Sequence, residues 1–161
     1  MTESRAGLIF GLLAAAFVVA SAGCSRAPST PAPSASGAQA SAMPETATLG
    51  DAEVSVSVVP TSILSDTVAH RYGVARERNR VLVLVGLRAG DASRNATVSG
   101  RARDLRGVAQ ALTFREVQAD GFVDYVAVAA ATPPDTLRFE LDVVDAAGQR
   151  ATLRFSRDLA P

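Results

Sequence analysis

Cysteine, histidine, lysine and tryptophan are almost or wholly missing from this sequence, which has one cysteine, one histidine and neither of the other two. A single cysteine excludes a disulfide within the chain and leaves no Cys-rich zinc motif. Stability must therefore come from packing. Without lysine, every one of the 16 basic residues is an arginine, and together with the many alanines this bias is typical of a GC-rich bacterial genome.

The shortage of histidine also limits the chemistry that the chain can perform. A metal site needs several converging ligands, so we expect the single histidine, His70, to be a surface or packing residue. The sequence has no G-x-S-x-G elbow and no Gly-rich phosphate loop after a predicted strand. The carboxylate pairs Asp142 with Asp145 and Glu116 with Asp120 lie at predicted strand ends or beside turns, where solvated charges are usual. We therefore expect no metal, no cofactor and no enzymatic activity.

Charge of one sign is not in excess, because 16 acidic residues balance the 16 basic ones. No global field favours nucleic acid, and we expect no nucleic-acid partner. One local concentration of charge is present in Arg76, Arg78 and Arg80, whose spacing is that of one side of a strand. Because arginine forks suit carboxylates and phosphates, these residues are a candidate anion patch for an anionic lipid or glycan. The alternative is ordinary pairing with acidic neighbours such as Glu77.

The one long hydrophobic run lies near the N-terminus, from Leu8 to Cys24, and reads LIFGLLAAAFVVASAGC. It is shorter than the ~20 apolar residues that a membrane-spanning helix needs, whereas a secretory signal fits its length. The small residues from Ser21 to Gly23 before the cysteine resemble the lipobox of a bacterial lipoprotein signal. We therefore predict a signal peptide over residues 1–23 and acylation of Cys24, which joins the protein to a membrane through its N-terminus.

Two alternatives remain for this stretch: an ordinary signal peptide, which gives a soluble periplasmic protein, and an uncleaved anchor. In the sorting scheme of acylated chains, Ser25 in place of an aspartate predicts the periplasmic face of the outer membrane. The next residues, up to Thr48, are mainly Pro, Ala and Ser. Such a segment buries too little surface to offset its ordering entropy. We predict that residues 24–48 are the acylated cysteine and a disordered linker.

A period of two predicts β-strands in the remaining residues, 49–161. Val54 begins an alternation of valine and serine that Pro60 ends. Residues 80–88 contain an uninterrupted apolar run, which is typical of a central strand that is covered on both faces. Three further strands are predicted over residues 96–102, 109–117 and 122–130.

The last two strands form a predicted hairpin whose register follows from the alternation of apolar residues. The shared inward face places Leu141 opposite Leu153, and Glu140 opposite Arg154 on the exposed face. This register leaves a three-residue loop that ends at Gly148, where a left-handed conformation favours glycine.

One short helix is predicted between the first two strands, at about residues 65–72, with Ser65 as its N-cap and Gly73 following its C-terminus. About seven short strands with a single helical turn predict an all-β fold, an antiparallel immunoglobulin-like β-sandwich over residues 49–161. The cysteine pair and the tryptophan of true immunoglobulin domains are absent.

Several segments of this domain together resemble a family of small secreted proteobacterial proteins catalogued as domain of unknown function 4426. The matching segments are Leu64 to Val74, Arg76 to Arg80, Leu112 to Val117 and Leu153 to Ser156. The family has no established activity, so the resemblance implies no catalytic residue. The lipobox and the linker lie outside the shared region, so it implies nothing about acylation.

Two functions are compatible with these features. We favour a lipid-anchored, non-catalytic β-sandwich that binds a protein or another envelope partner in the periplasm. The alternative is an envelope enzyme, hydrolytic or carbohydrate-active, that uses carboxylates which the sequence does not single out. An enzyme requires a concave pocket with convergent polar groups, whereas a binding module can present an apolar patch or an open strand edge.

Overall fold

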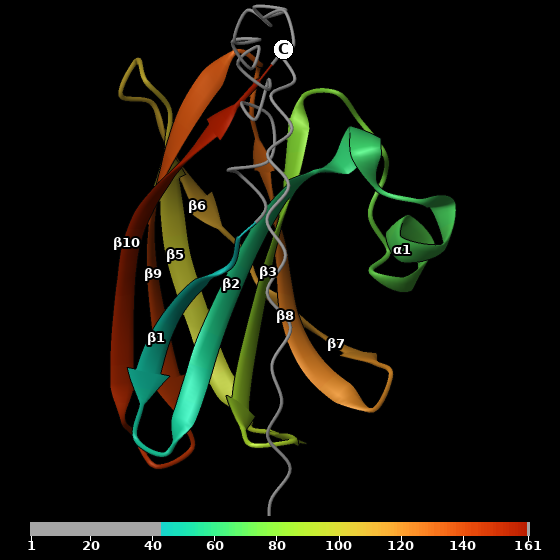
Figure 1. The fold of residues 1–161 in the computed structure, drawn as a ribbon. Coiled ribbons are helices and arrows are strands. Elements are labelled where there is room, and N and C mark those ends of the chain that lie inside the picture. Colours follow the sequence, from blue (N-terminus) through green and yellow to red (C-terminus); the bar gives the residue numbers. More distant parts are fainter. Residues whose placement is uncertain (1–42, 161) are drawn as a thin grey trace, which may run out of the picture. The chain divides into compact units, whose positions relative to one another are not determined.

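The structure is a computed structural model that describes residues 43–160. Ten strands in this part of the chain form two antiparallel sheets that pack face to face (Figure 1). One sheet contains, in spatial order, β1 (Glu45–Leu49), β2 (Ala52–Pro60), β3 (Arg80–Ala89), β8 (Phe122–Ala130) and β7 (Arg115–Ala119), with the short β4 (Ala92–Ser93) beside β3. The other contains β10 (Arg150–Leu159), β9 (Asp135–Asp145), β5 (Ala96–Arg103) and β6 (Ala109–Leu112). The predicted antiparallel β-sandwich is confirmed, with ten strands where about seven were expected.

The main core lies between the two sheets and follows from the alternation of apolar residues along the strands. Valines of β2 and β3 face inward from one sheet, and Leu137, Leu141 and Val143 of β9 face inward from the other. Each of these three β9 side chains is 0% exposed. The rings of Phe139 and Phe155 stack within this core, with their centroids 5.1 Å apart.

The uninterrupted apolar run of β3 is buried on both faces, as predicted. Strands β2 and β8 flank β3, so it is a central strand of the six-stranded sheet. Its residue Val83 faces the other sheet, whereas Leu82 faces outward into a second, smaller cluster with Leu64, Ala69 and Val126. The connection from β2 to β3 supplies the cover for this outer face.

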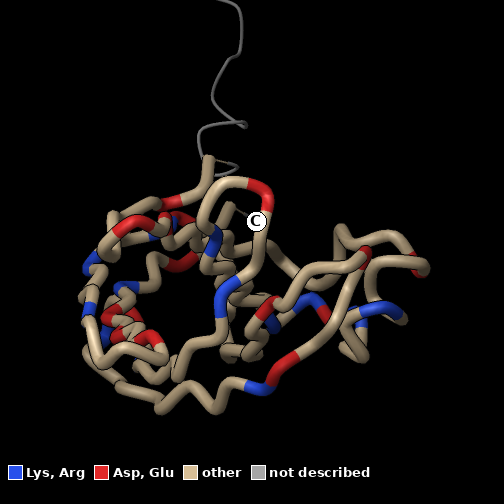
Figure 2. Tube along the Cα trace, turned by 90° about the horizontal axis from the view of Figure 1, so that it is seen from below, with Lys and Arg blue, Asp and Glu red and all other residues tan. Residues whose placement is uncertain are grey.

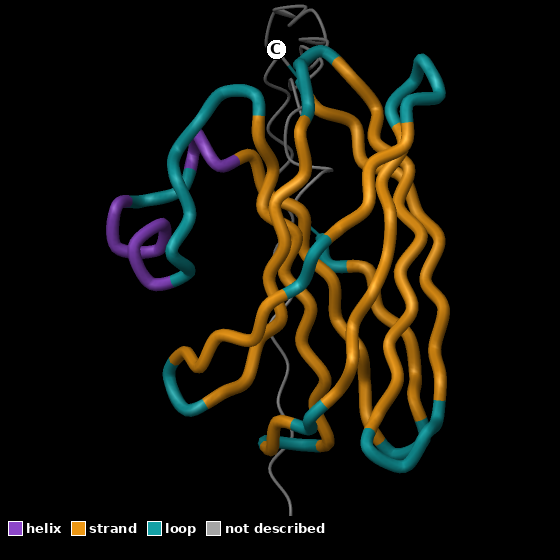
Figure 3. The backbone as a smooth tube through the Cα atoms, turned by 180° about the vertical axis from the view of Figure 1, so that it is seen from behind, coloured by secondary structure: helices purple, strands orange, loops and turns teal. Residues whose placement is uncertain are grey.

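That connection contains a 3₁₀ turn (Thr61–Ile63) and the helix α1 (Asp66–Arg71), which lie on the outer side of the sheet (Figure 3). The predicted helix ends are confirmed. The Ser65 hydroxyl accepts a hydrogen bond from the Val68 N–H at 3.2 Å, which caps one of the free donors of the first turn. Gly73 has a φ of 56°, the left-handed conformation that ends a helix. No helix within residues 43–160 is long and apolar enough to cross a membrane.

The β9–β10 hairpin has the predicted register. Leu141 lies opposite Leu153, and Glu140 lies opposite Arg154. The Asp145 N–H bonds the Gln149 carbonyl at 3.0 Å, which closes a three-residue loop whose last residue is Gly148, with a φ of 80°. Alternation and turn chemistry were therefore sufficient to fix this pairing.

Two predicted boundaries are wrong. Strand β1 begins at Glu45, inside the predicted linker 24–48, because ladder pairing with β2 and burial of Leu49 stabilise a segment whose composition resembles a linker. The single strand predicted over residues 109–117 is two strands, β6 and β7, which belong to different sheets. Residues 1–23 and Cys24 lie outside the described residues, so the signal peptide and the acylation stay predictions.

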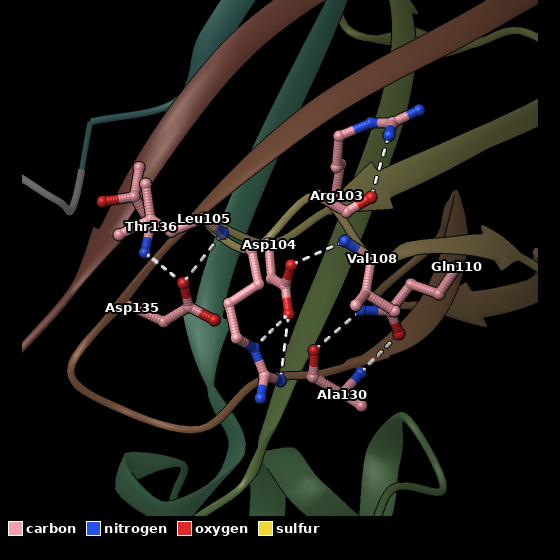
Figure 4. A network of polar contacts seen from close by, with 10 residues as sticks. Arg103, Asp104, Leu105, Val108, Gln110, Ala130, Asp135 and Thr136 are labelled. Carbon is pink, nitrogen blue, oxygen red and sulfur yellow. Dashed lines mark hydrogen bonds and ion pairs between the residues drawn. The ribbon is translucent and has the colours of Figure 1, made fainter.

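Side-chain hydrogen bonds hold the loop between β5 and β6 and the end of β8, where the chain leaves one sheet for the other (Figure 4). The Gln110 amide exchanges two hydrogen bonds of 2.8 Å with the backbone of Ala130, which joins β6 to the end of β8. Asp104 accepts hydrogen bonds from the Val108 N–H and from Arg106. Burial opposes its ionisation, but these hydrogen bonds outweigh that effect and hold the pKa of Asp104 below its ordinary value.

Candidate functional site

A pocket of about 280 Å³ opens on the outer face of the six-stranded sheet, beside the C-terminal end of α1. Strand alternation places its residues there, because the inward positions of the same strands hold the valines of the core. We call it the outer pocket and define it by the side chains that supply its polar groups and its aromatic wall: Ser55, Ser57, Tyr72, Arg88, Phe122 and Asp124.

Asp124 is a buried carboxylate in the floor of the outer pocket, and its residue is 5% exposed. One of its oxygens, Oδ1, accepts a hydrogen bond of 2.9 Å from Arg88 Nη2, and the other, Oδ2, accepts one of 3.0 Å from the Tyr72 hydroxyl. A buried charge is tolerated only when it is paired and its oxygens are satisfied. These contacts link β8 to β3 and to the end of α1.

Arg88 is positioned in the pocket by two further contacts besides that with Asp124. Its second terminal nitrogen, Nη1, donates to Ser93 Oγ at 2.8 Å. Its guanidinium lies 4.2 Å from the centre of the Phe122 ring, which is a cation–π contact. The Ser93 hydroxyl also accepts the Val123 N–H at 3.0 Å. The short β4 is therefore bonded to both β3 and β8 through a side chain.

Tyr72 stays protonated and donates its hydrogen bond to Asp124. Burial, followed by that hydrogen bond, raises the pKa of the Tyr72 phenol above its ordinary value. The backbone at Tyr72 and at the following residue is held as well, because Arg115 of β7 donates to the carbonyl oxygens of Tyr72 and Gly73. Arg71, which precedes Tyr72 in the chain, forms an ion pair of 2.5 Å with Asp120 in the turn between β7 and β8.

The hydroxyls of Ser55 and Ser57 contribute hydrogen-bonding capacity that the fold does not use. Among residues 43–160, neither hydroxyl has a hydrogen-bond partner, although both side chains are half-buried. The space beside them depends on Gly86, because a Cβ at this position would lie 3.3 Å from Ser55 Oγ and 3.5 Å from Arg88 Nη2. The pocket thus combines a fixed, charge-balanced floor with unpaired hydroxyl groups.

This arrangement can bind a ligand through its polar groups. Each oxygen of Asp124 already accepts one hydrogen bond, and the other carboxylate that lines the pocket, Asp120, is paired with Arg71. The single histidine, His70, is exposed on α1 and does not line the pocket. In the described part of the chain, no group of three His, Cys, Asp or Glu side chains could hold a metal ion.

A family model described as a domain of unknown function, DUF4426, matches residues 46–160. The chain belongs to the DUF4426 family. A crystal structure of a DUF4426 family protein from Pseudomonas aeruginosa PAO1 is similar over 73% of this chain and 95% of that chain, with 26% sequence identity and a TM-score of 0.64. The resemblance predicted from the sequence is thereby confirmed.

A second solved structure is a copper-bound variant of FetP from uropathogenic Escherichia coli, which covers 73% of this chain and 98% of that chain. Its identity of 14% and TM-score of 0.49 support no inference about this DUF4426 chain. The sequence has no significant match among curated proteins.

The three arginines of the predicted anion patch lie in and after the loop that enters β3 of this DUF4426 domain. Arg76 forms an ion pair of 2.5 Å with Asp66, and Arg80 bonds Glu77 at 3.4 Å. Arg78 is exposed and forms no ion pair within residues 43–160. The residues before Arg80 form a loop and a turn, not a strand. The charges of Arg76 and Arg80 are already compensated by carboxylates. The binding of an anion at this patch stays a prediction.

The outer pocket itself was missed by the sequence analysis, although two signals pointed to it. Asp124 is a carboxylate inside an otherwise apolar strand, and Arg88 ends the apolar run of β3. A charge in a strand that is covered on both faces needs a partner of opposite sign. The Tyr72 contact could not be predicted, because it depends on where α1 lies on the sheet.

Proposed function

We propose that this DUF4426 chain is a non-catalytic binding module of the bacterial envelope, and that its outer pocket receives an uncharged polar group of an envelope partner. The observation that carries the proposal is the pair of half-buried serine hydroxyls, Ser55 and Ser57, beside a floor that is already rigid. Polar groups that converge in a pocket without internal partners are available to a ligand.

The charges of the pocket favour an uncharged ligand. Arg88 and Asp124 neutralise each other, and Asp120 at the rim is paired with Arg71. A charged ligand would meet no free counter-charge and would lose its hydration on entering. Hydroxyl or amide groups, in contrast, can bond Ser55 and Ser57 while apolar parts contact Leu84 and Phe122. Such groups occur on the sugars and peptides of an envelope.

The proposed location rests on the N-terminal sequence. Acylation of Cys24 would hold the domain at the periplasmic face of the outer membrane, with the following Pro, Ala and Ser-rich residues as a tether. A tethered module is suited to binding a partner in the same compartment, because the tether raises the effective concentration of the two binding surfaces.

The test is affinity capture from solubilised envelopes with the full chain as bait. Ser57→Leu places a bulky apolar side chain in the pocket, and Ser99→Leu makes the same change on the exposed outer face of the other sheet. We expect wild type and Ser99→Leu to retain the same partner and Ser57→Leu to lose it, with similar melting temperatures for all three. Equal capture by the three proteins would refute the role of the pocket.

A further inference from the structure

Charged residues of both signs are spread along the described chain (Figure 2). On the outer face of the four-stranded sheet, four arginines line one hollow. Outward positions on β5, β9 and β10 line this shallow hollow of about 430 Å³. We call this surface the arginine face and define it by four exposed side chains: Arg101, Arg103, Arg138 and Arg154. The one carboxylate that lines the same hollow is Glu140.

Glu140 compensates only one part of the arginine face. Its Oε2 accepts a hydrogen bond of 2.8 Å from Arg101 Nε, and its Oε1 accepts one of 2.7 Å from Arg154 Nη2. These hydrogen bonds, that from Arg154 first, hold the pKa of Glu140 below its ordinary value, so it is ionised at neutral pH. One negative charge thus pairs with two guanidinium groups, so Arg101, Glu140 and Arg154 together keep one excess positive charge.

The neighbouring pair of arginines, Arg103 and Arg138, has no carboxylate partner in the part of the chain that the structure describes. Arg103 of β5 lies directly opposite Arg138 of β9, and Ser156 of β10 lies on the other side of Arg138. Within residues 43–160, neither Arg103 nor Arg138 forms an ion pair, and the Arg103 side chain donates a hydrogen bond to the Gly107 carbonyl at 2.8 Å. Asp158, the next acidic residue along β10, accepts a hydrogen bond from Thr136. Like charges directly opposite each other in a sheet are destabilising. An anion placed between Arg103 and Arg138 would remove this repulsion.

The chemistry of the row formed by Arg103, Arg138 and Ser156 fits a phosphate group. Guanidinium forks bind phosphate oxygens with two parallel hydrogen bonds, and the Ser156 hydroxyl lies at the next position of the same row. The residues project from three adjacent strands of an open sheet face, so a phosphate on an extended surface can reach them.

The point at which the described chain begins favours a membrane lipid, rather than a soluble anion, as the source of the phosphate. Arg157, the residue after Ser156 on β10, donates from Nη2 to the Met43 carbonyl at 3.0 Å. Arg157 occupies an inward position of β10, so the described chain begins beside this edge strand, on the side opposite Ser156. The preceding segment, which carries Cys24, is thus connected at the edge of the sheet that bears the arginine face. We propose that the arginine face contacts the anionic lipid headgroups of the membrane, with a headgroup phosphate between Arg103 and Arg138. The orientation of the arginine face toward the membrane rests on the proposed acylation of Cys24, whereas its charge pattern does not.

The size of the effect follows from membrane electrostatics. A basic side chain near an anionic lipid surface strengthens binding about fivefold, and the effect falls off within a Debye length. Replacing Arg103 and Arg138 should weaken binding to anionic vesicles by about 25-fold at low salt. A lipid anchor makes such a weak contact effective, because one acyl signal and one basic surface act together.

The experiment is co-sedimentation of the full chain, carrying Cys24→Ala so that no acyl chain contributes, with vesicles of phosphatidylcholine alone or mixed with phosphatidylglycerol in equal parts. Arg103→Gln/Arg138→Gln is compared with Arg78→Gln/Arg80→Gln, which removes the same charge from the loop before β3 and from the first residue of that strand. We expect only the first variant to lose binding to the anionic vesicles, with no difference on neutral ones. Its melting temperature without lipid should rise, because a like-charge pair is removed.

Three results would overturn the proposal. The first is equal sedimentation of both variants and the parent. The second is loss of binding in the Arg78→Gln/Arg80→Gln variant alone, which would assign the contact to the loop. The third is that free inorganic phosphate binds the protein as strongly as the anionic vesicles do and displaces it from them. This result would identify a site for a soluble anion. Ser57→Leu should sediment like the parent, because the outer pocket takes no part in vesicle binding. Failure of the vesicle test would therefore leave the proposed function of the outer pocket untouched, and the reverse also holds.

Discussion

The contact between Asp124 and Arg88 makes a sharp prediction, because it joins three elements through one buried carboxylate. Asp124→Ala removes the acceptor for Arg88 Nη2 and for the Tyr72 hydroxyl. Breaking a buried ion pair from one side costs about 3–5 kcal/mol of unfolding free energy. The Arg88 side chain is 32% exposed and keeps its bond to Ser93, so solvent reduces this figure. We expect a loss of about 2–3 kcal/mol.

The assay is urea or guanidinium unfolding of a double-mutant cycle. Replacing both partners by apolar residues, as in Arg88→Met/Asp124→Val, leaves no uncompensated charge and should cost less than Asp124→Val alone. Asp51→Ala is the matched control, because it breaks an exposed ion pair of 2.9 Å with Arg94 and should change the midpoint little. If the effects of Arg88→Met and Asp124→Val simply add, or if Asp124→Ala behaves like Asp51→Ala, the pair does not hold the floor of the pocket.

The remaining predictions concern the core, the anchor and the phenol. Leu141→Ala should lower the free energy of unfolding by about 2–5 kcal/mol, because Leu141 is 0% exposed in the core. Glu140→Ala, on the outer face of the same strand, should lower it far less in the same denaturant unfolding experiment. Equal losses would mean that the register is wrong. Cys24→Ala should abolish incorporation of radiolabelled palmitate and release the domain into the periplasmic fraction, and a wild-type protein without label would exclude the lipobox. Because the folded pKa of Tyr72 is raised above an unfolded value of about 10, its contribution to stability is complete below pH ~10 and is lost as the pH rises through the folded pKa. Tyr72→Phe should therefore flatten the alkaline part of a stability profile, and an unchanged profile would show that the phenol does not contribute.

The hairpin and the central strand could be predicted because each depends on information within a few residues. The inward face of β9 and the glycine at position 148 both required the same pairing, so the register had one solution. The apolar run of β3 required cover on two faces, and the helix with its Ser65 cap supplies one of them. Local pattern and tertiary packing agree at these places.

The parts that the sequence did not predict depend on contacts between distant segments. Strand β1 has linker-like composition and forms because β2 offers its edge. The break between Leu112 and Arg115 moves the chain from one sheet to the other, and no change of period marks it. In the same way, Tyr72 reaches Asp124 across 52 positions of the chain. The contribution of Tyr72 to the outer pocket could therefore be inferred only from the fold.

The most direct test of the binding function is chemical-shift mapping of the full chain by NMR, with the fraction that wild-type bait retains from envelopes as the titrant. The outer pocket predicts that the largest amide shifts fall at Ser55, Ser57 and Gly86, and that Ser57→Leu abolishes them. Shifts confined to the four-stranded sheet, or shifts that persist in Ser57→Leu, would contradict the assignment of ligand binding to this pocket.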